Sequence, residues 1–384
     1  MGMMERILKL MAEKKASDVY LSAFAPATIK INGQAVPINS QPLPADAVKN
    51  LLAEVLPPTR IEELEETLEL NMAHAIDGVG NFRISAMKQR GTYACVIRYI
   101  ATDIPALESL NVPAGLADMI LEKRGLILMV GATGAGKSTT LAAMIDYRNA
   151  RMPGHILTVE DPVEFIFTNK KSIVNQREVG SDTMAMQTAL KNALRQAPDV
   201  ILIGEIRDRE TMSAAIAYAQ SGHLCLATMH ANNSYQALNR ILSFYPVEVR
   251  PTLLGDLATA LKAIVSQRLL RTVEGKRAPA VEIMYNTKLV QDLIEKGDFS
   301  GVKDAMEKSM TDGSQTFEQD IARLIVEGVV ERKEGITHSD SPTNLMWRLA
   351  NDFENAKKAA EEPEDEEDMG PSFTEIQLDV KSTV

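Results

Sequence analysis

The segment 131–138 constrains the fold of this chain more than any other part of it. It reads Gly-Ala-Thr-Gly-Ala-Gly-Lys-Ser, which matches the phosphate-binding P-loop pattern in full. An apolar strand-like run, 126–130, precedes it, and a helical pattern begins near Lys137. Because glycines let backbone N–H groups turn onto phosphate oxygens at a helix N-terminus, this unit indicates a nucleotide site. A chance match in a glycine-containing loop is the alternative, and the strand–loop–helix context argues against it.

The P-loop pattern assigns roles to its polar residues. Lys137 is expected to reach the β- and γ-phosphates, and the Ser138 hydroxyl is expected to ligate Mg²⁺. ATP and Mg²⁺ are therefore the predicted cofactors. The residues predicted to bind the nucleotide are Gly131, Ala132, Thr133, Gly134, Ala135, Gly136, Lys137, Ser138 and Thr139.

Apolar runs and helical patterns alternate after the P-loop, which predicts a mainly parallel sheet covered on both faces. The predicted strands are 126–130, 156–160, 200–203, 224–228 and 265–270. The fold class is thus α/β. The predicted parts are an N-terminal α/β domain over 1–100, a linker over 101–115, an ATPase core over 116–285, a helical region over 286–358 and an acidic disordered tail over 359–384.

Two predicted strands end in acidic residues. The strand 200–203 leads into Glu205, which can hold Mg²⁺ through water or polarise an attacking water. The alternative is a carboxylate that belongs to a helix start, since Asp208 follows. The other strand leads into Glu160, Asp161 and Glu164, at the edge where ligands bind in doubly wound sheets. One of these three is a plausible general base, and a solvated turn is the alternative.

Histidines and arginines supply further candidates. His230 follows the strand 224–228 on the expected phosphate side, where it could sense the γ-phosphate, whereas His223 lies at the opposite end of that strand. Arg83 and Arg98 lie on adjacent predicted strands and could point to one face, as arginines that stabilise transition-state charge do. An ordinary pair of surface arginines is the alternative for these two.

Composition excludes several classes of protein. Cys95 and Cys225, the two cysteines, lie in apolar runs, so a disulfide framework and a four-cysteine zinc site are both excluded. No apolar run is long enough to span a bilayer and no signal peptide is recognisable, so we expect a cytoplasmic protein. The net charge is −11, but 11 acidic and 3 basic residues fall within 351–384, so most of the acidity belongs to the tail. Charge therefore argues only weakly against a nucleic-acid motor.

The N-terminal apolar residues Met4, Ile7, Leu8 and Met11 follow helical spacing. Such a helix could touch a membrane. Its polar face is not rich in lysine, so we expect it to pack on its own domain instead.

Taken in order, several boxes resemble one family. They are 16–22, the arginine strands 81–84 and 96–100, the extended P-loop 131–140, the acidic box 155–165, the segment 194–208 and the histidine box 222–232. The chain resembles the secretion and type IV pilus ATPases, and within them the PilT/PilU pilus-retraction ATPases, over about 16–284. The resemblance implies that Glu164 is the catalytic base, that Glu205 belongs to the Walker B segment, and that Arg83 and Arg98 face the phosphates.

The resemblance also implies an architecture and a task. It implies a homohexamer whose subunits join a PAS-like N-terminal domain to a RecA-like P-loop ATPase domain, with the nucleotide between them. ATP-driven domain rotation would pass to an inner-membrane platform protein, so that the pilus retracts and the cell shows twitching motility. The protein would lie at the cytoplasmic face of the inner membrane at the pilus base, with no nucleic-acid partner.

Departures from the family pattern narrow the prediction. The tetracysteine zinc motif and the long extra N-terminal domain of assembly ATPases are missing, which favours retraction. The family's Ala-Ile-Arg-Asn-Leu-Ile motif is degraded at 289–294, and an acidic tail extends the chain. Both favour the accessory PilU type, acting with a PilT-type ATPase. The alternatives are a pilus-assembly or type II secretion ATPase, and a regulatory ATP-binding partner with little hydrolysis.

Overall fold

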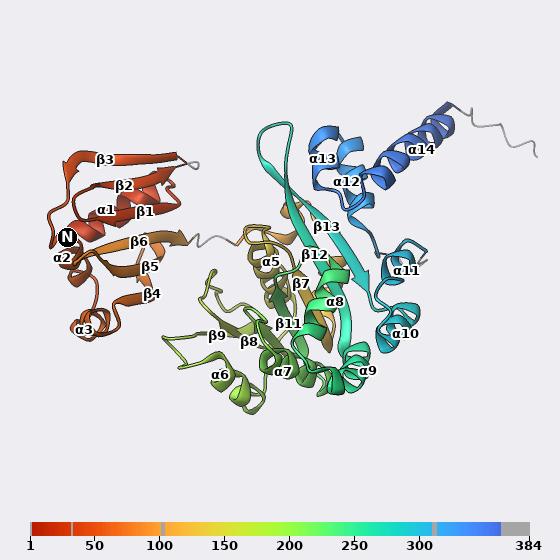
Figure 1. The fold of residues 1–384 in the computed structure, drawn as a ribbon, viewed down its shortest axis with the longest axis horizontal. Coiled ribbons are helices and arrows are strands. Elements are labelled where there is room, and N and C mark those ends of the chain that lie inside the picture. The colour runs from red at the N-terminus through yellow and green to blue at the C-terminus, as the bar shows by residue number, and fades with distance from the viewer. Residues whose placement is uncertain (1, 32–33, 101–103, 309–312, 362–384) are drawn as a thin grey trace, which may run out of the picture.

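A computed structural model describes residues 2–31, 34–100, 104–308 and 313–361. Each of its two sheets belongs to a separate domain, and the C-terminal helices extend from the larger domain (Figure 1). The Asn32-Gly33 pair, whose sequence predicts a tight hairpin turn, and the tail from 362 onward lie outside the described residues.

The N-terminal domain contains an antiparallel sheet whose strands run in the order β3-β2-β1-β6-β5-β4. Three helices bury their apolar sides against one shared core with this sheet. The elements are α1 (Met3–Glu13), β1 (Asp18–Ser22), β2 (Pro26–Ile31), β3 (Gln34–Pro42), α2 (Ala47–Ala53), α3 (Pro58–Thr67), β4 (Glu69–Ile76), β5 (Gly80–Gln89) and β6 (Thr92–Ile100).

Helix α1 packs on its own domain, as the sequence predicts. Met4, Ile7, Leu8 and Met11 are all buried in the domain's core, so the apolar side of this helix is not free to contact a membrane.

The larger domain is built on a sheet with the strand order β13-β12-β7-β11-β10-β8-β9, parallel except for β13. Along central strand β7, Leu126 and Leu128 enter one apolar core and Ile127 and Met129 enter the other. Successive side chains of a strand point to opposite faces, so helices cover this sheet on both sides. The elements are α4 (Gly115–Leu121), β7 (Gly125–Val130), α5 (Lys137–Arg151), β8 (Gly154–Glu160), β9 (Ser172–Glu178), α6 (Met186–Ala193), β10 (Val200–Ile203), α7 (Arg209–Gln220), β11 (Leu224–Met229), α8 (Ser234–Ser243), α9 (Arg250–Ala260), β12 (Leu261–Arg271) and β13 (Arg277–Tyr285).

Two expectations about local structure are wrong. The helical pattern over 51–70 predicts one continuous acidic helix, but the structure has α2 and α3 there, because Pro57 and Pro58 interrupt the chain and Pro58 opens the second helix. The edge strands β9 and β13 were not expected. Strand β13 contains Pro279, which an edge strand tolerates because one side of it needs no ladder donor.

The last three helices, α12 to α14, form a fourth apolar core with residues of β12 and β13, which includes Phe317, Ile321 and Leu345. Helices α10 and α11 instead pack into one of the two cores of the ATPase-domain sheet. Within the described residues, no helix is both long and apolar enough to cross a membrane. The helices are α10 (Lys288–Lys296), α11 (Val302–Lys308), α12 (Phe317–Val326), α13 (Arg332–His338) and α14 (Pro342–Glu361).

Candidate functional site

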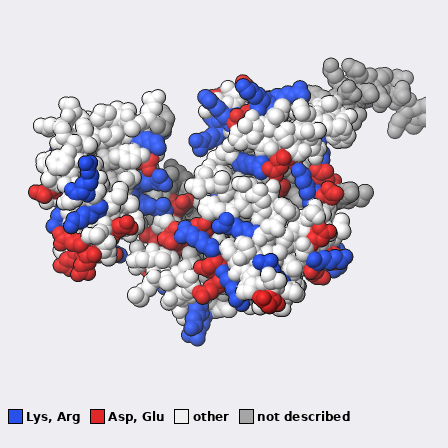
Figure 2. Space-filling view, in the orientation of Figure 1, with Lys and Arg blue, Asp and Glu red and all other residues white. Residues whose placement is uncertain are grey.

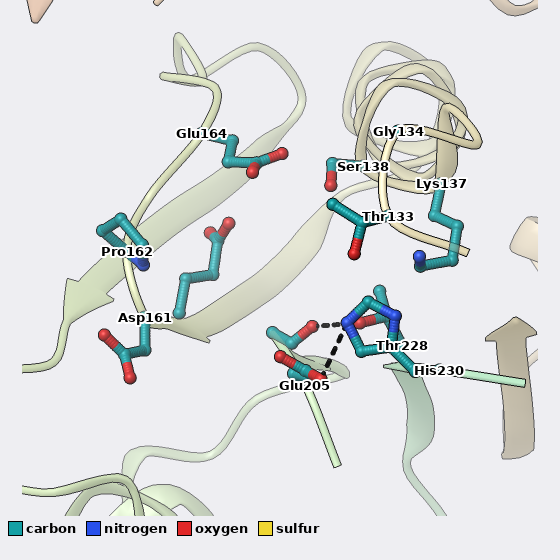
Figure 3. A pocket seen from close by; sticks show the side chains of 12 residues that line it. Thr133, Gly134, Lys137, Ser138, Asp161, Pro162, Glu164, Glu205, Thr228 and His230 are labelled. Carbon is teal, nitrogen blue, oxygen red and sulfur yellow. Dashed lines mark hydrogen bonds and ion pairs between the residues drawn. The ribbon is translucent and has the colours of Figure 1, made fainter. Parts of the chain in front are cut away.

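Loops from the carboxyl ends of four parallel strands, β7, β8, β10 and β11, meet around one cavity of about 190 Å³ (Figure 3). This is the edge at which open α/β sheets bind ligands. The lining residues are Thr133, Gly134, Lys137, Ser138, Glu160, Asp161, Pro162, Glu164, Gly204, Glu205, Thr228 and His230.

The P-loop wraps the start of α5. Gly134 and Gly136 have φ of 80° and 86°, a backbone region that residues with a side chain rarely adopt. The Lys137 ammonium donates hydrogen bonds to the carbonyls of Gly131 (2.8 Å) and Ala132 (2.9 Å). Burial lowers the pKa of Lys137, and the nearby carboxylates of Glu205 and Glu164 oppose that shift. The lysine is thus preorganised beside the loop that would hold phosphate.

Gln267 on β12 supports this loop, although no motif in the sequence points to this residue. Its side-chain amide donates to the Ala135 carbonyl (2.9 Å) and accepts from the Thr140 hydroxyl (2.9 Å). A Cβ added at Gly136 would lie 2.7 Å from the side-chain amide nitrogen of Gln267. A Cβ added at Gly131 would lie 2.5 Å from the main-chain carbonyl oxygen of Gln267. Buried Gln267 therefore fixes the P-loop from the neighbouring strand.

Glu205 lies in the cavity rather than at a helix start. One carboxylate oxygen pairs with His230 Nε2 (3.1 Å) and the other with Arg207 (2.6 Å). Asp208 is the N-cap of α7, accepting from the Thr211 N–H (2.8 Å), and that bond lowers its pKa. The alternative weighed for Glu205 therefore applies to Asp208, and Glu205 and His230 form a coupled pair beneath the P-loop.

Glu160 is the most perturbed acid in the cavity. Its carboxylate accepts from the Thr158 hydroxyl (2.7 Å), the Gln176 amide (3.5 Å) and the backbone N–H of Glu164. Burial nevertheless raises its pKa to about 7. Glu160 thus lies next to the loop that carries Glu164.

Glu164 is exposed and faces the cavity opposite Ser138 (Figure 3). The loop around it is held from strand β9, where the Glu178 carboxylate accepts the N–H of Val163 (3.0 Å). Asp161 is exposed and lies 3.7 Å from Arg207. The predicted acidic loop is thus an anchored structure and not a freely solvated turn.

Arg83 and Arg98 are directly paired across β5 and β6, so they share one face as expected. Their surroundings differ. Arg98 donates to Asp18 of its own domain (2.9 Å). Arg83 is half-buried, which lowers its pKa, while Glu164, Glu178 and Asp161 of the ATPase domain oppose that shift. The carboxylates of the ATPase domain therefore act electrostatically on Arg83 from across the domain boundary.

Asp199 and His223 both stand at the amino ends of strands and lie away from the cavity. Asp199, at the start of β10, accepts the backbone N–H of His155 (2.8 Å). His223 precedes β11, and its ring Nδ1 lies 3.3 Å from the Tyr218 carbonyl. Both have structural partners at the opposite edge of the sheet.

The cavity offers oxygen donors suited to Mg²⁺, which prefers such ligands and usually retains several waters beside substrate phosphates. The Ser138 hydroxyl and the carboxylates of Glu160, Glu164 and Glu205 all line it. Among the described residues, no group of three His, Cys, Asp or Glu side chains is placed to hold a metal alone. Because both Glu205 oxygens are engaged, this residue fits a water-mediated contact.

Comparison with known proteins now identifies the family. The model of the type II/IV secretion system protein family matches residues 3–297. The chain belongs to this family. It is 46% identical to the type IV pilus ATPase PilU of Pseudomonas aeruginosa over 90% of this chain and 91% of that protein. It is 35% identical to the pilus retraction ATPase PilT of the same organism, over 88% and 98% respectively.

A solved structure agrees with these relatives. The crystal structure of the pilus retraction motor PilT with bound ADP matches with a TM-score of 0.84 at 36% identity, covering 90% of this chain and 99% of that one. The family recognised from the ordered boxes, the fold class with its N-terminal and ATPase domains, and the assignment as an ATPase are confirmed.

Proposed function

We propose that this protein is a Mg²⁺-dependent ATPase of the PilU type, which assembles as a homohexamer and helps to retract type IV pili. The observation that carries the proposal is the single cavity where Lys137, Ser138, Glu164, Glu205 and His230 meet from four separate loops. The similarity to PilU and PilT gives the chemistry its context.

Each residue has a role that follows from its position. The P-loop amides and Lys137 bind the phosphates, and Glu164, which faces the cavity, accepts the proton of the attacking water. In this proposal Glu205, which pairs with His230, orients that histidine towards the γ-phosphate. When bound by Ser138 and, through water, by Glu205, Mg²⁺ neutralises charge that develops on the phosphates.

Arg83 and Arg98 are proposed to stabilise the transition state from the N-terminal domain. The electrostatic influence of Glu164 on Arg83 supports its closeness to the catalytic loop. Nucleotide between the two domains then gives hydrolysis a means of changing how they are arranged, which is how a ring motor does work on an inner-membrane platform protein. We place the protein at the cytoplasmic face of that membrane, beside a PilT-type partner.

A steady-state ATPase assay tests the enzymatic part. Lys137→Ala is expected to abolish Mg²⁺-dependent hydrolysis, and Glu164→Gln to reduce kcat about 100-fold or more. Lys170→Ala is the matched control, because Lys170 is an exposed lysine paired with Asp146 (2.7 Å) outside the cavity. Wild-type hydrolysis in Lys137→Ala would refute the proposal.

The same assay separates the alternatives. A regulatory partner would bind ATP without turnover, both alone and when mixed with a PilT-type ATPase. Over the described residues on the face shown in Figure 2, basic and acidic side chains intermingle on the ATPase domain, and an acidic group lies over α3, so no basic stripe tracks that face. Hydrolysis is accordingly expected to be indifferent to added DNA.

Complementation tests the cellular part. Expression in a pilus-retraction mutant that lacks this gene should restore twitching when the PilT-type partner is present, and a fluorescent fusion should gather at pilus bases. Restored pilus assembly in an assembly-ATPase mutant would favour the secretion or assembly alternative instead.

A further inference from the structure

The loop after His230 is tied to distant parts of the chain. We call residues 230–234, which join β11 to α8, the His230 loop. The Asn232 carbonyl accepts from Arg268 on β12 (3.1 Å), and the Ser234 N–H donates to buried Glu282 on β13 (2.8 Å). The Asn233 side chain donates to Asp340, just before α14 (2.8 Å). The partners in these three bonds all lie outside β11 and α8, the two elements that the loop connects.

Arg268 is the centre of this arrangement. Its guanidinium also donates to the His338 carbonyl and pairs with the second oxygen of Asp340. The guanidinium carbon lies 3.9 Å from the ring centroid of fully buried Phe317, the first residue of α12. Because an arginine fork is planar and its donors point in fixed directions, this set of partners leaves one orientation for the side chain. Arg268 thus joins the His230 loop to the C-terminal helices.

Gln267, the residue before Arg268 on β12, contacts the P-loop. Gln267 holds the P-loop through the Ala135 carbonyl, while Arg268, the next residue of β12, holds Asn232. Successive side chains of a strand point to opposite faces. One strand therefore sets the positions of both the P-loop and the His230 loop.

We propose that Arg268, together with Asp340, is a positioning residue for ATP hydrolysis: it fixes the His230 loop so that His230 meets Glu205 and the γ-phosphate side of the cavity. The inference rests on the proposed ATPase function and extends it, because it makes the C-terminal helices a support of the catalytic loop. Arg268 touches none of the residues that hold phosphate. Its loss is therefore expected to act on turnover and to leave nucleotide binding nearly unchanged.

Four variants test the proposal in the full-length protein. Arg268→Gln removes the charge and the fork, Arg268→Lys keeps the charge, and Asp340→Asn weakens the bridge. Arg323→Gln is the matched control, since Arg323 lies on α12 and pairs with Asp320 (2.9 Å) and Glu327 (2.8 Å). It tests whether any lost arginine ion pair in the helical region has the same effect.

Arg268→Gln is expected to lower kcat about 10- to 100-fold, because misplacing a catalytic group by about 1 Å costs that much. KM for ATP and the Kd for ADP should stay within about threefold of wild type. Arg268→Lys should recover part of kcat, Asp340→Asn should lose less than Arg268→Gln, and Arg323→Gln should retain wild-type kcat. An unchanged kcat in folded Arg268→Gln, or an equal loss in Arg323→Gln, would overturn the proposal.

Hydrogen exchange adds a readout that needs no turnover. Amides in 231–236 should exchange faster in Arg268→Gln than in wild type and be unchanged in Arg323→Gln. Equal protection in Arg268→Gln and wild type would overturn the positioning role. If wild type itself hydrolyses no ATP, the proposed function fails, whereas exchange still decides whether Arg268 holds the loop. Should Arg268→Gln fail to fold, Arg268→Lys and Asp340→Asn carry both measurements.

Discussion

Replacing Glu160 by glutamine is expected to stabilise the folded protein increasingly as the pH rises from 5 to 8. The Glu160 carboxyl has a pKa of about 7 in the folded chain against 4.5 for an ordinary glutamate, because burial disfavours its charged form. Between those two values the folded state binds more protons at this site than the unfolded state does. The contribution of Glu160 to the free energy of unfolding of the wild-type protein therefore falls as the pH rises, and it levels off above pH 7.

The magnitude follows from the two pKa values. At about 1.4 kcal/mol per pH unit, a rise from 4.5 to about 7 corresponds to about 3 kcal/mol over the whole titration. About 2 to 3 kcal/mol of it falls between pH 5 and pH 8. Glutamine keeps the size of the side chain and an acceptor for the Thr158 hydroxyl, but it does not ionise. Its hydrogen bonds shift stability equally at every pH, so the pH-dependent part of the difference isolates the ionisation.

Urea unfolding followed by far-UV circular dichroism measures this difference at pH 5, 6, 7 and 8. Nucleotide is removed and a chelator is present, because a bound cation would favour the ionised carboxylate and hide the effect. Exposed Glu62→Gln in the N-terminal domain is the control for the loss of one carboxylate. A difference between Glu160→Gln and wild type that stays constant from pH 5 to pH 8 would refute the reasoning.

Three further predictions concern the supports of the cavity. Gln267→Leu breaks the buried bonds to the P-loop and to Thr140, so it should cost about 1 to 3 kcal/mol in unfolding free energy and weaken ADP binding measured by calorimetry. Gly136→Ala places a Cβ at positive φ and 2.7 Å from Gln267, so ADP affinity should fall about tenfold or more in the same titration. Arg83→Ala should lower kcat more than Arg98→Ala in an ATPase assay, because the carboxylates of the acidic loop act electrostatically on Arg83, whereas Arg98 is paired with Asp18 of its own domain.

Each of these has an outcome that contradicts it. If Gln267→Leu kept wild-type ADP affinity and stability, the P-loop would not depend on the hydrogen bonds of Gln267. Gly275→Ala is the control for Gly136→Ala, since it shares the positive φ (77°) but has open space around the added Cβ. Equal effects of these two on ADP binding would remove the steric argument. A larger loss of kcat in Arg98→Ala than in Arg83→Ala would contradict the prediction that Arg83 contributes more to hydrolysis.

The nucleotide site was largely predictable because its signals are local. The P-loop needs glycines at fixed spacing between a strand and a helix, and that requirement is visible in 126–138 without any tertiary contact. The positions of Glu164, Glu205 and His230 after buried strands predicted that they lie at one edge of the sheet, and the cavity brings them together there. Element ends that depend on proline, and edge strands with weak alternation such as β9, were less predictable.

The remaining features of the site depend on packing between segments far apart in the chain. The pKa of Glu160 follows from burial, the P-loop is held by Gln267, and Arg268 binds the His230 loop and Asp340 across 36 and 72 positions. Arg83 and Arg98 form one cross-strand pair in the sheet, yet only tertiary structure pairs Arg98 with Asp18 and half-buries Arg83. The loops that line the cavity can be recognised in the sequence, because backbone turns and strand ends follow local rules. The pKa values and hydrogen bonds of those loops cannot, because they depend on the packing of residues that lie far apart in the chain.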